Sequence, residues 1–188
     1  MRQPNEKVSD DRDVELLSAV SHGDRKALEE LYVGYHRRLV RFLSRLAPRY
    51  DTVEEIINDT FMIVWQGAGG FRGASRVSTW IIGIAYRTAL KSLRRTQTRI
   101  KVQAFTDVAE MSVDPENEAE MRDWVNQGLN HLPLEQRMVL ELAYHLGHSI
   151  EEIAAITGCP TGTVKARMHH AREKLREYLP ALAGRNQA

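Results

Sequence analysis

The sequence SIEEIAAITGCPTGTVKARMHHAR, over residues 149–172, decides how the second half of the chain folds. Ser149 followed three residues later by Glu152 forms a capping box, which begins a helix of about two turns. Gly158 then allows the left-handed backbone that ends a helix, and Val164 is placed to pack a second helix on the first. This pattern predicts a helix-turn-helix.

The second helix of this motif, which Thr161 is expected to cap, is strongly basic. Five Lys and Arg residues lie between Lys165 and Arg176, against the single acid Glu173. In a helix-turn-helix the first turns of this helix enter the major groove and contact base edges and phosphates. The alternative is an αα-hairpin with a solvated basic face, but the excess of base favours DNA. The positions that the helix offers are Thr163, Lys165, Ala166, Arg167, His169, His170, Arg172 and Lys174.

The first half also has helical periodicity, without the sustained alternation of a β-strand. A short apolar stripe ends at Gly23, and Asp24 can cap a long second helix that ends before Pro48. Thr52 with Glu55 is another expected capping box, which opens a third helix. The apolar positions of these three helices are Val14, Leu17 and Val20, then Leu28, Leu31, Tyr32, Tyr35, Leu39, Phe42, Leu43 and Leu46, then Ile56, Ile57, Phe61 and Val64.

Four glycines interrupt the helical pattern over residues 67–78, and a fourth helix follows them. The run from Arg87 to Lys101 contains six bases and no acid. Beside a glycine-rich loop that carries aromatic side chains, such a run favours nucleic-acid contact over a merely solvated face. The four helices predict a first domain over residues 10–96.

The segment 97–115 shows little periodicity, and we expect a flexible acidic linker there. Seven acids and one base lie within residues 107–123. Asp114 is the expected cap of a further helix, whose core positions are Trp124, Val125, Leu129 and Leu132. The sequence therefore predicts an all-α fold, with two helical domains joined by this linker and the helix-turn-helix in the second domain, residues 116–182.

Composition limits the class of protein. The 188 residues are 43% hydrophobic and 27% charged, as in ordinary globular proteins. The net charge of +1 does not by itself indicate nucleic acid. One cysteine, Cys159, excludes an internal disulfide and fits a reducing compartment. No apolar run approaches the roughly 18 residues of a membrane span, and the polar start is no signal peptide. We expect a cytoplasmic protein without membrane insertion.

Together the two halves resemble a known family, the sigma factors of the extracytoplasmic-function type in the sigma-70 superfamily. The first-half motifs are EEIINDTFMIVW at 54–65, FRG at 71–73, STWIIGIA at 78–85 and LRR at 93–95. The second-half motifs are Leu132-Pro133, Arg137, the helix from Ser149 to Ala154, GTVK at 162–165, and Ala171-Arg172 with Leu175. The resemblance covers residues 12–180 in the family's order.

The resemblance implies a transcription initiation factor, which is a monomer when free and carries out no reaction with a cofactor or metal. Such factors bind bacterial core RNA polymerase, recognise the minus-ten and minus-thirty-five elements of promoter DNA and promote melting. Some are held by an anti-sigma factor. The helix over residues 54–65 docks on the clamp coiled coil of the polymerase. The implied contacts are Glu55, Asn58, Asp59 and Phe61, with Ile56 and Val64 in the core.

The resemblance also implies DNA contacts. The residues expected to contact the unpaired minus-ten strand are Phe71, Arg72, Ser75, Trp80, Arg87, Lys91, Arg94 and Arg95. The family commonly has asparagine in place of Arg87, and Lys91 is unusual, so we expect these two to contact phosphate. The residues expected to read bases of the upstream element are Lys165, Ala166, His169 and His170. Thr163 lies in the same turn, and Arg167 and Arg172 are expected nearer the DNA backbone.

Two other functions fit parts of the sequence. One is a conventional regulator that binds duplex DNA without polymerase, and the extended match in the first half disfavours it. The other is a metal-dependent enzyme. Glu141, His145 and His148 have spacing that fits a metal site, but no matching cysteine or acid cluster accompanies them. We expect exposed polar positions at a helix end there, and for Cys159 a small residue in a tight turn.

Overall fold

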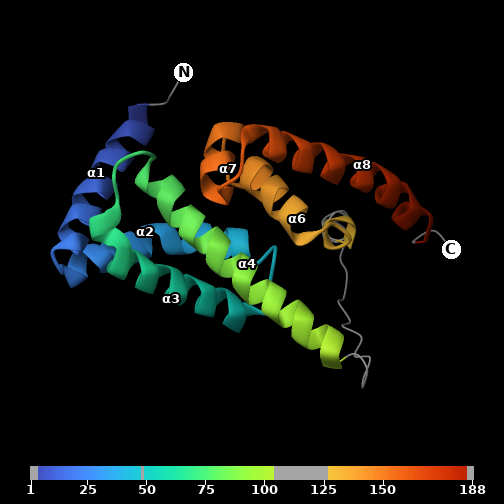
Figure 1. The fold of residues 1–188 in the computed structure, drawn as a ribbon, viewed down its shortest axis with the longest axis horizontal. Helices are drawn as coiled ribbons and strands as arrows, with labels where there is room; N and C mark the ends of the chain where they lie inside the picture. The colour runs from blue at the N-terminus through green and yellow to red at the C-terminus, as the bar shows by residue number, and fades with distance from the viewer. Residues whose placement is uncertain (1–3, 48, 104–126, 186–188) are drawn as a thin grey trace.

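The structure is a computed structural model that describes residues 4–47, 49–103 and 127–185 (Figure 1). The regular elements in those residues are all helical, which confirms the predicted fold class. The first half consists of α1 (Pro4–Ser21), α2 (Arg25–Leu43), α3 (Tyr50–Gly67), the 3₁₀ helix η1 (Ala68–Gly70) and α4 (Val77–Gln103). The second half contains α6 (Leu134–Leu140), the π-helix η2 (Glu141–His145), α7 (Ile150–Thr157) and α8 (Thr161–Arg185). No helix in the described ranges is long and apolar enough to cross a membrane.

The start of α2 is capped as predicted. The Asp24 carboxylate accepts hydrogen bonds from the amides of Lys26, at 2.8 Å, and Ala27, at 3.2 Å. The apolar stripe of α2 is largely buried, because Leu31, Tyr35, Leu39, Phe42 and Leu43 face the core. In α1, Leu17 and Val20 are buried, whereas Val14, the first residue of that apolar stripe, is 47% exposed.

Two predicted caps are wrong. Helix α3 begins at Tyr50, and its N-cap residue, Arg49, makes no capping hydrogen bond through its side chain. Thr52 therefore lies inside the first turn, where the backbone is helical rather than extended as a cap requires. Thr161 is likewise the first residue of α8.

The helix-turn-helix has the predicted local geometry. The Ser149 hydroxyl accepts from the amide of Glu152 at 3.2 Å, and the Glu152 carboxylate accepts from the amide of Ser149 at 3.0 Å. Gly158 ends α7 with φ of 66°, in the left-handed region. Val164 is fully buried between the two helices and the core. These contacts confirm both the capping box and the turn.

The two serine and threonine positions give a matched stability test. We expect Ser149→Ala to lower the free energy of unfolding by about 1 kcal/mol, because it leaves a helix-end amide without its acceptor. Thr52→Ala is expected to change it by less than about 0.5 kcal/mol, because no cap is lost. Urea denaturation followed by circular dichroism measures both values. Equal losses for the two variants would contradict the assignment of the caps.

The ends of the two halves differ from the predicted boundaries. Helix α4 continues to Gln103, so it enters the segment that we expected to begin a linker at residue 97. The acidic residues within 107–123, the expected cap Asp114, and Trp124 and Val125 lie outside the described residues. Leu129 and Leu132 are buried, as predicted, in a small cluster with Leu140 and Ala171.

One hydrophobic core crosses from the first half to the second. Its buried side chains extend from Leu16 in α1, through Ile81 in α4, to Ile153 in α7 and Met168 in α8. Helix α7 packs against α4, while α3 and α8 lie on opposite sides of the molecule (Figure 1). Local sequence patterns did not predict this packing, and it determines which surfaces are exposed.

Candidate nucleic-acid interface

Helix α8 has distinct inner and outer faces over its first three turns. Val164, Met168 and Ala171 are buried at helical spacing. The outward positions Lys165, Ala166, His169, His170 and Arg172 are exposed, and Thr163 and Arg167 are half-buried. Lys165 and His169 lie one turn apart, which places both on the same exposed surface. The structure therefore brings the predicted upstream-element residues together on one helix.

Arg167 departs from the others because it faces the first half. Its guanidinium donates to the Cys159 sulfur at 3.8 Å. Burial raises the pKa of the Tyr86 hydroxyl in α4, and the nearby charge of Arg167 acts in the opposite direction. Cys159 itself lies 3.1 Å from the Thr157 hydroxyl and packs on the core beside the turn. In this arrangement Arg167 contacts protein rather than being directed only to solvent.

The glycine-rich loop gathers two aromatic side chains at the start of α4. The Phe71 and Trp80 rings have centroids 5.4 Å apart. The Trp80 ring also covers Gly67. A Cβ atom added at Gly67 would lie 3.7 Å from the Cζ2 atom of Trp80. Arg72 is exposed and Ser75 is half-buried in the same loop. The loop thus combines aromatic faces with a cation, as single-stranded nucleic acid binding requires.

The basic side of α4 continues from this loop. Arg87, Lys91, Arg94 and Arg95 are all exposed, and their spacing of three or four residues places them on one side of the helix. Arg94 is already engaged, because its guanidinium forms an ion pair with Glu135 of the second half.

The exposed face of α3 carries three of the four predicted docking residues. Glu55, Asn58 and Asp59 are exposed, whereas Ile56 and Val64 are buried as expected. Phe61 is 4% exposed, and its ring packs 4.9 Å from that of Tyr32, so in this structure it lies in the core rather than on the exposed face of α3.

Sequence reasoning missed two apolar residues on that face. Met62 and Ile63 are 58% and 44% exposed. They follow Asp59 by three and four residues, so they lie beside it on the helix. Both residues lie outside the apolar stripe of α3, and this position in the sequence could have indicated that they are exposed.

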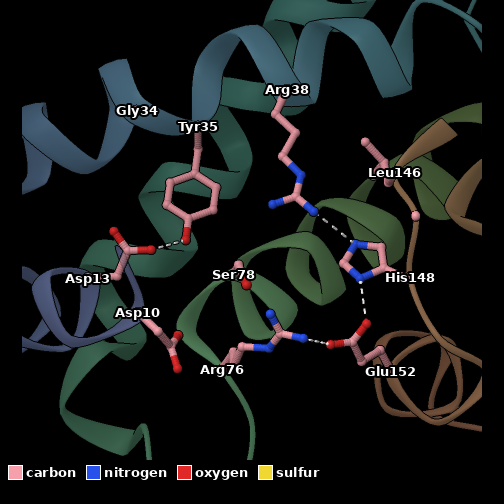
Figure 2. Close-up of a pocket in the computed structure, with 11 residues that line it drawn as sticks. Asp10, Asp13, Gly34, Tyr35, Arg38, Arg76, Ser78, Leu146, His148 and Glu152 are labelled. Carbon is pink, nitrogen blue, oxygen red and sulfur yellow. Dashed lines mark hydrogen bonds and ion pairs between the residues drawn. The ribbon is translucent and has the colours of Figure 1, made fainter. Parts of the chain in front are cut away.

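A polar network joins the two halves around a cavity of about 240 Å³ (Figure 2). An Arg38 N–H lies 3.4 Å from His148 Nε2, and His148 Nδ1 lies 3.3 Å from Glu152. Arg76 forms an ion pair with the other oxygen of Glu152. Burial lowers the pKa of His148, as does the charge of Arg38, while Glu152 opposes both. A neutral ring with its proton on Nδ1 satisfies both contacts.

The expectation that Glu141, His145 and His148 are all exposed polar positions is wrong for two of them. His148 is 9% exposed and Glu141 only 3%, because the first half covers them. The Glu141 carboxylate lies 3.7 Å from Arg45 Nε and 3.3 Å from His145 Nδ1. Burial raises the pKa of Glu141, against the charges of Arg45 and Arg137. Across the described parts of the chain, no group of three or more His, Cys, Asp or Glu side chains is arranged to hold a metal.

The same two halves appear in known proteins. Sigma-70 region 2 matches residues 31–99, and sigma-70 region 4 matches residues 122–175. The ECF RNA polymerase sigma-E factor of Escherichia coli (strain K12) is 33% identical over 174 residues, which cover 85% of this chain and 90% of that protein. The ECF RNA polymerase sigma factor SigM of Mycobacterium tuberculosis is 34% identical over 168 residues, covering 89% and 84% of the two chains.

Two solved structures share the fold. CnrH, in complex with the cytosolic domain of CnrY, superposes with a TM-score of 0.68 at 21% identity, covering 90% of this chain and 98% of that one. The sigma factor RpoE from Bartonella quintana, in complex with the anti-sigma factor NepR, gives a TM-score of 0.65 at 25% identity, with 82% and 98% covered. The relatives of at least 33% identity match over most of their own length. The chain therefore belongs to the ECF sigma factors of RNA polymerase.

Proposed function

We propose that the chain directs core RNA polymerase to promoters, using three surfaces. The exposed face of α3, with Glu55, Asn58 and Asp59, docks on the polymerase. The aromatic loop and the basic side of α4 hold the unpaired minus-ten strand, and the first turns of α8 read the minus-thirty-five element. The residues proposed for the minus-ten strand are Phe71, Arg72, Ser75, Trp80, Arg87, Lys91, Arg94 and Arg95.

One observation carries this proposal. A single chain contains sigma-70 regions 2 and 4 in sequence order, and each region presents an exposed basic surface at a helix. A regulator that binds duplex DNA alone has no need of the first region. Melting would draw on binding energy to flipped bases and to the strand backbone, so we assign no catalytic residue.

The partners follow from the same proposal. The bound molecules are core RNA polymerase and promoter DNA, and this places the activity in the cytoplasm. In the two solved structures, CnrH is bound to the cytosolic domain of CnrY, and RpoE is bound to the anti-sigma factor NepR. We therefore also propose that an anti-sigma factor can hold this chain.

The recognition helix gives the most specific test of the proposal. We expect Lys165→Ala and His169→Ala each to weaken binding of the polymerase complex to its promoter by about 1–3 kcal/mol, as for loss of a direct base contact. The loss should concentrate at particular minus-thirty-five base pairs, measured with a set of promoters varied one pair at a time. Lys26→Ala, an exposed position on α2, is the matched control and should have no effect. A uniform response to every promoter variant would contradict base reading by these residues.

A further inference from the structure

Two adjacent histidines lie on the outward face of α8. His169 and His170 are both exposed, and their ring centroids are 5.6 Å apart. His169 lies one turn after Lys165 and one turn before Arg172, so cations flank it along the surface of the helix. Both rings belong to the surface that is proposed to read the minus-thirty-five element. A histidine at either position can therefore meet DNA as a neutral ring or as a cation.

The acid closest to these rings on α8 already has another partner. Glu173 follows His169 by four residues, and its carboxylate forms an ion pair with Arg176 at 2.6 Å. In the described ranges, the histidines that form ion pairs with acids are His36, His145 and His148. The rings of His169 and His170 are therefore left without an acid of the described structure to hold a proton on them.

The charged groups of the two helices packed against α8 are also directed elsewhere. Hydrogen bonds from its own backbone amide and from Ser149 lower the pKa of Glu151 in α7, and the charge of Lys165 adds to this effect, so Glu151 lies beside Lys165. The guanidinium of Arg137 in α6 donates to the carbonyl of Arg45. The other acids of α6 and α7 form ion pairs with arginines of the first half, which are Glu135–Arg94 and Glu152–Arg76.

DNA would change the balance of charge around the two rings. Histidine is the side chain that changes its charge between about pH 5 and 8. Neighbouring cations disfavour a protonated ring, whereas a phosphate within a few ångströms favours it. When a bound polyanion favours the protonated ring, DNA binding and proton uptake are linked, and each strengthens the other.

We infer that His169 and His170 take up protons when α8 binds the minus-thirty-five element, so that promoter affinity depends on pH. This inference rests on the proposed function, since that function supplies the DNA at this surface. The gain in affinity is complete at low pH, where the rings are protonated in the free and the bound protein. It is lost as the pH rises through the range in which the bound rings release their protons. The promoter complex should therefore be weaker at about pH 8 than at about pH 6.

The first test compares the parent with a double variant that does not titrate at these positions. His169→Gln with His170→Gln keeps hydrogen-bonding side chains but cannot gain a charge. The affinity of each polymerase complex for a duplex promoter is measured at about pH 6, 7 and 8, at constant ionic strength. Titrating groups of the polymerase are common to both complexes, so the ratio of the parent affinity to the variant affinity isolates the two histidines.

We expect this ratio to be at least about fivefold larger at pH 6 than at pH 8, because a rise of one unit in the pKa of one histidine corresponds to at most tenfold in affinity. His22→Gln is the matched control, since His22 is an exposed histidine directly after α1. It should have the pH dependence of the parent. A ratio that stays the same across this pH range, or an equal change in the control, would overturn the inference.

The second test asks whether the added charge acts on phosphates. The slope of the logarithm of affinity against the logarithm of salt concentration changes by about 0.9 for each phosphate that is neutralised. At pH 6 the parent slope should be steeper than that of the glutamine variant by about 1–2, and at pH 8 the two slopes should be alike. His169→Lys with His170→Lys carries the charges at both pH values and should have the steeper slope at both. Equal slopes of the parent and the glutamine variant at pH 6 would refute proton uptake at the DNA surface.

A scrambled duplex separates this inference from the proposed function. If the parent complex binds the promoter no better than the scrambled duplex at every pH, the function itself is wrong. If the complex prefers the promoter at every pH, but the ratio of parent to glutamine variant does not change, only the proton linkage is wrong.

Discussion

Reversing the charge of two exposed acids on α3, by Glu55→Lys with Asp59→Lys, is expected to weaken binding to core polymerase at least about 100-fold. Both side chains are exposed and lie one turn apart on the same face. Placing like charges against a complementary surface costs several kcal/mol, and about 2.8 kcal/mol already corresponds to 100-fold. Affinity measured by fluorescence anisotropy of the labelled protein gives the ratio directly.

The control for this variant has the same change in net charge. Asp11→Lys with Glu29→Lys alters two exposed acids on other helices, α1 and α2. We expect its affinity for polymerase to remain within about threefold of the parent, because surface charges elsewhere act mainly through screened long-range steering. Near-parental affinity of the Glu55 and Asp59 variant, or an equal loss in both variants, would remove α3 as the docking helix.

Local patterns predicted the helix-turn-helix because its determinants lie close together in sequence. The capping box of Ser149, the left-handed turn at Gly158 and the buried Val164 all appear in the structure as predicted. The Thr52 prediction failed for a local reason too, since the helix begins two residues earlier at Tyr50 and no capping hydrogen bond marks its start.

Phe61 shows that two kinds of inference can disagree. Its position in the apolar stripe of α3 predicts burial, and it is buried against Tyr32. The family resemblance placed it among the docking contacts instead. Periodicity reports the environment of a side chain within its own fold, and it therefore predicted the burial of Phe61, while the docking role stays a prediction.

The contact between the halves was beyond sequence reasoning. Glu141 and His148 look like exposed polar positions at the end of a helix, and only packing of the first half against them makes them buried. Arg38 and His148 are 110 residues apart in sequence. Helical periodicity says which face of a helix is apolar, but it does not say which distant arginine will cover a polar end.

The dependence of promoter binding on polymerase has the largest expected effect. Two small domains each make a modest contact with DNA, and neither alone buries enough surface to hold one site against excess nonspecific DNA. Docking on polymerase fixes their separation, so the second contact becomes intramolecular and the combined affinity rises by about 10²–10⁴-fold. Free protein should therefore bind promoter DNA weakly and with strong salt dependence.

The most direct measurement compares promoter binding and the permanganate reactivity of unpaired minus-ten thymines, with and without core polymerase. We expect the free chain to show weak binding and no reactive thymines, and the polymerase complex to bind tightly and open the minus-ten region. The Glu55 and Asp59 charge-reversal variant should lose both gains, while the polymerase complex of Lys26→Ala should behave as the parent. Tight, sequence-specific binding of duplex promoter by the chain alone, unchanged by polymerase and without thymine reactivity, would contradict the assignment of this chain as a promoter-melting partner of polymerase.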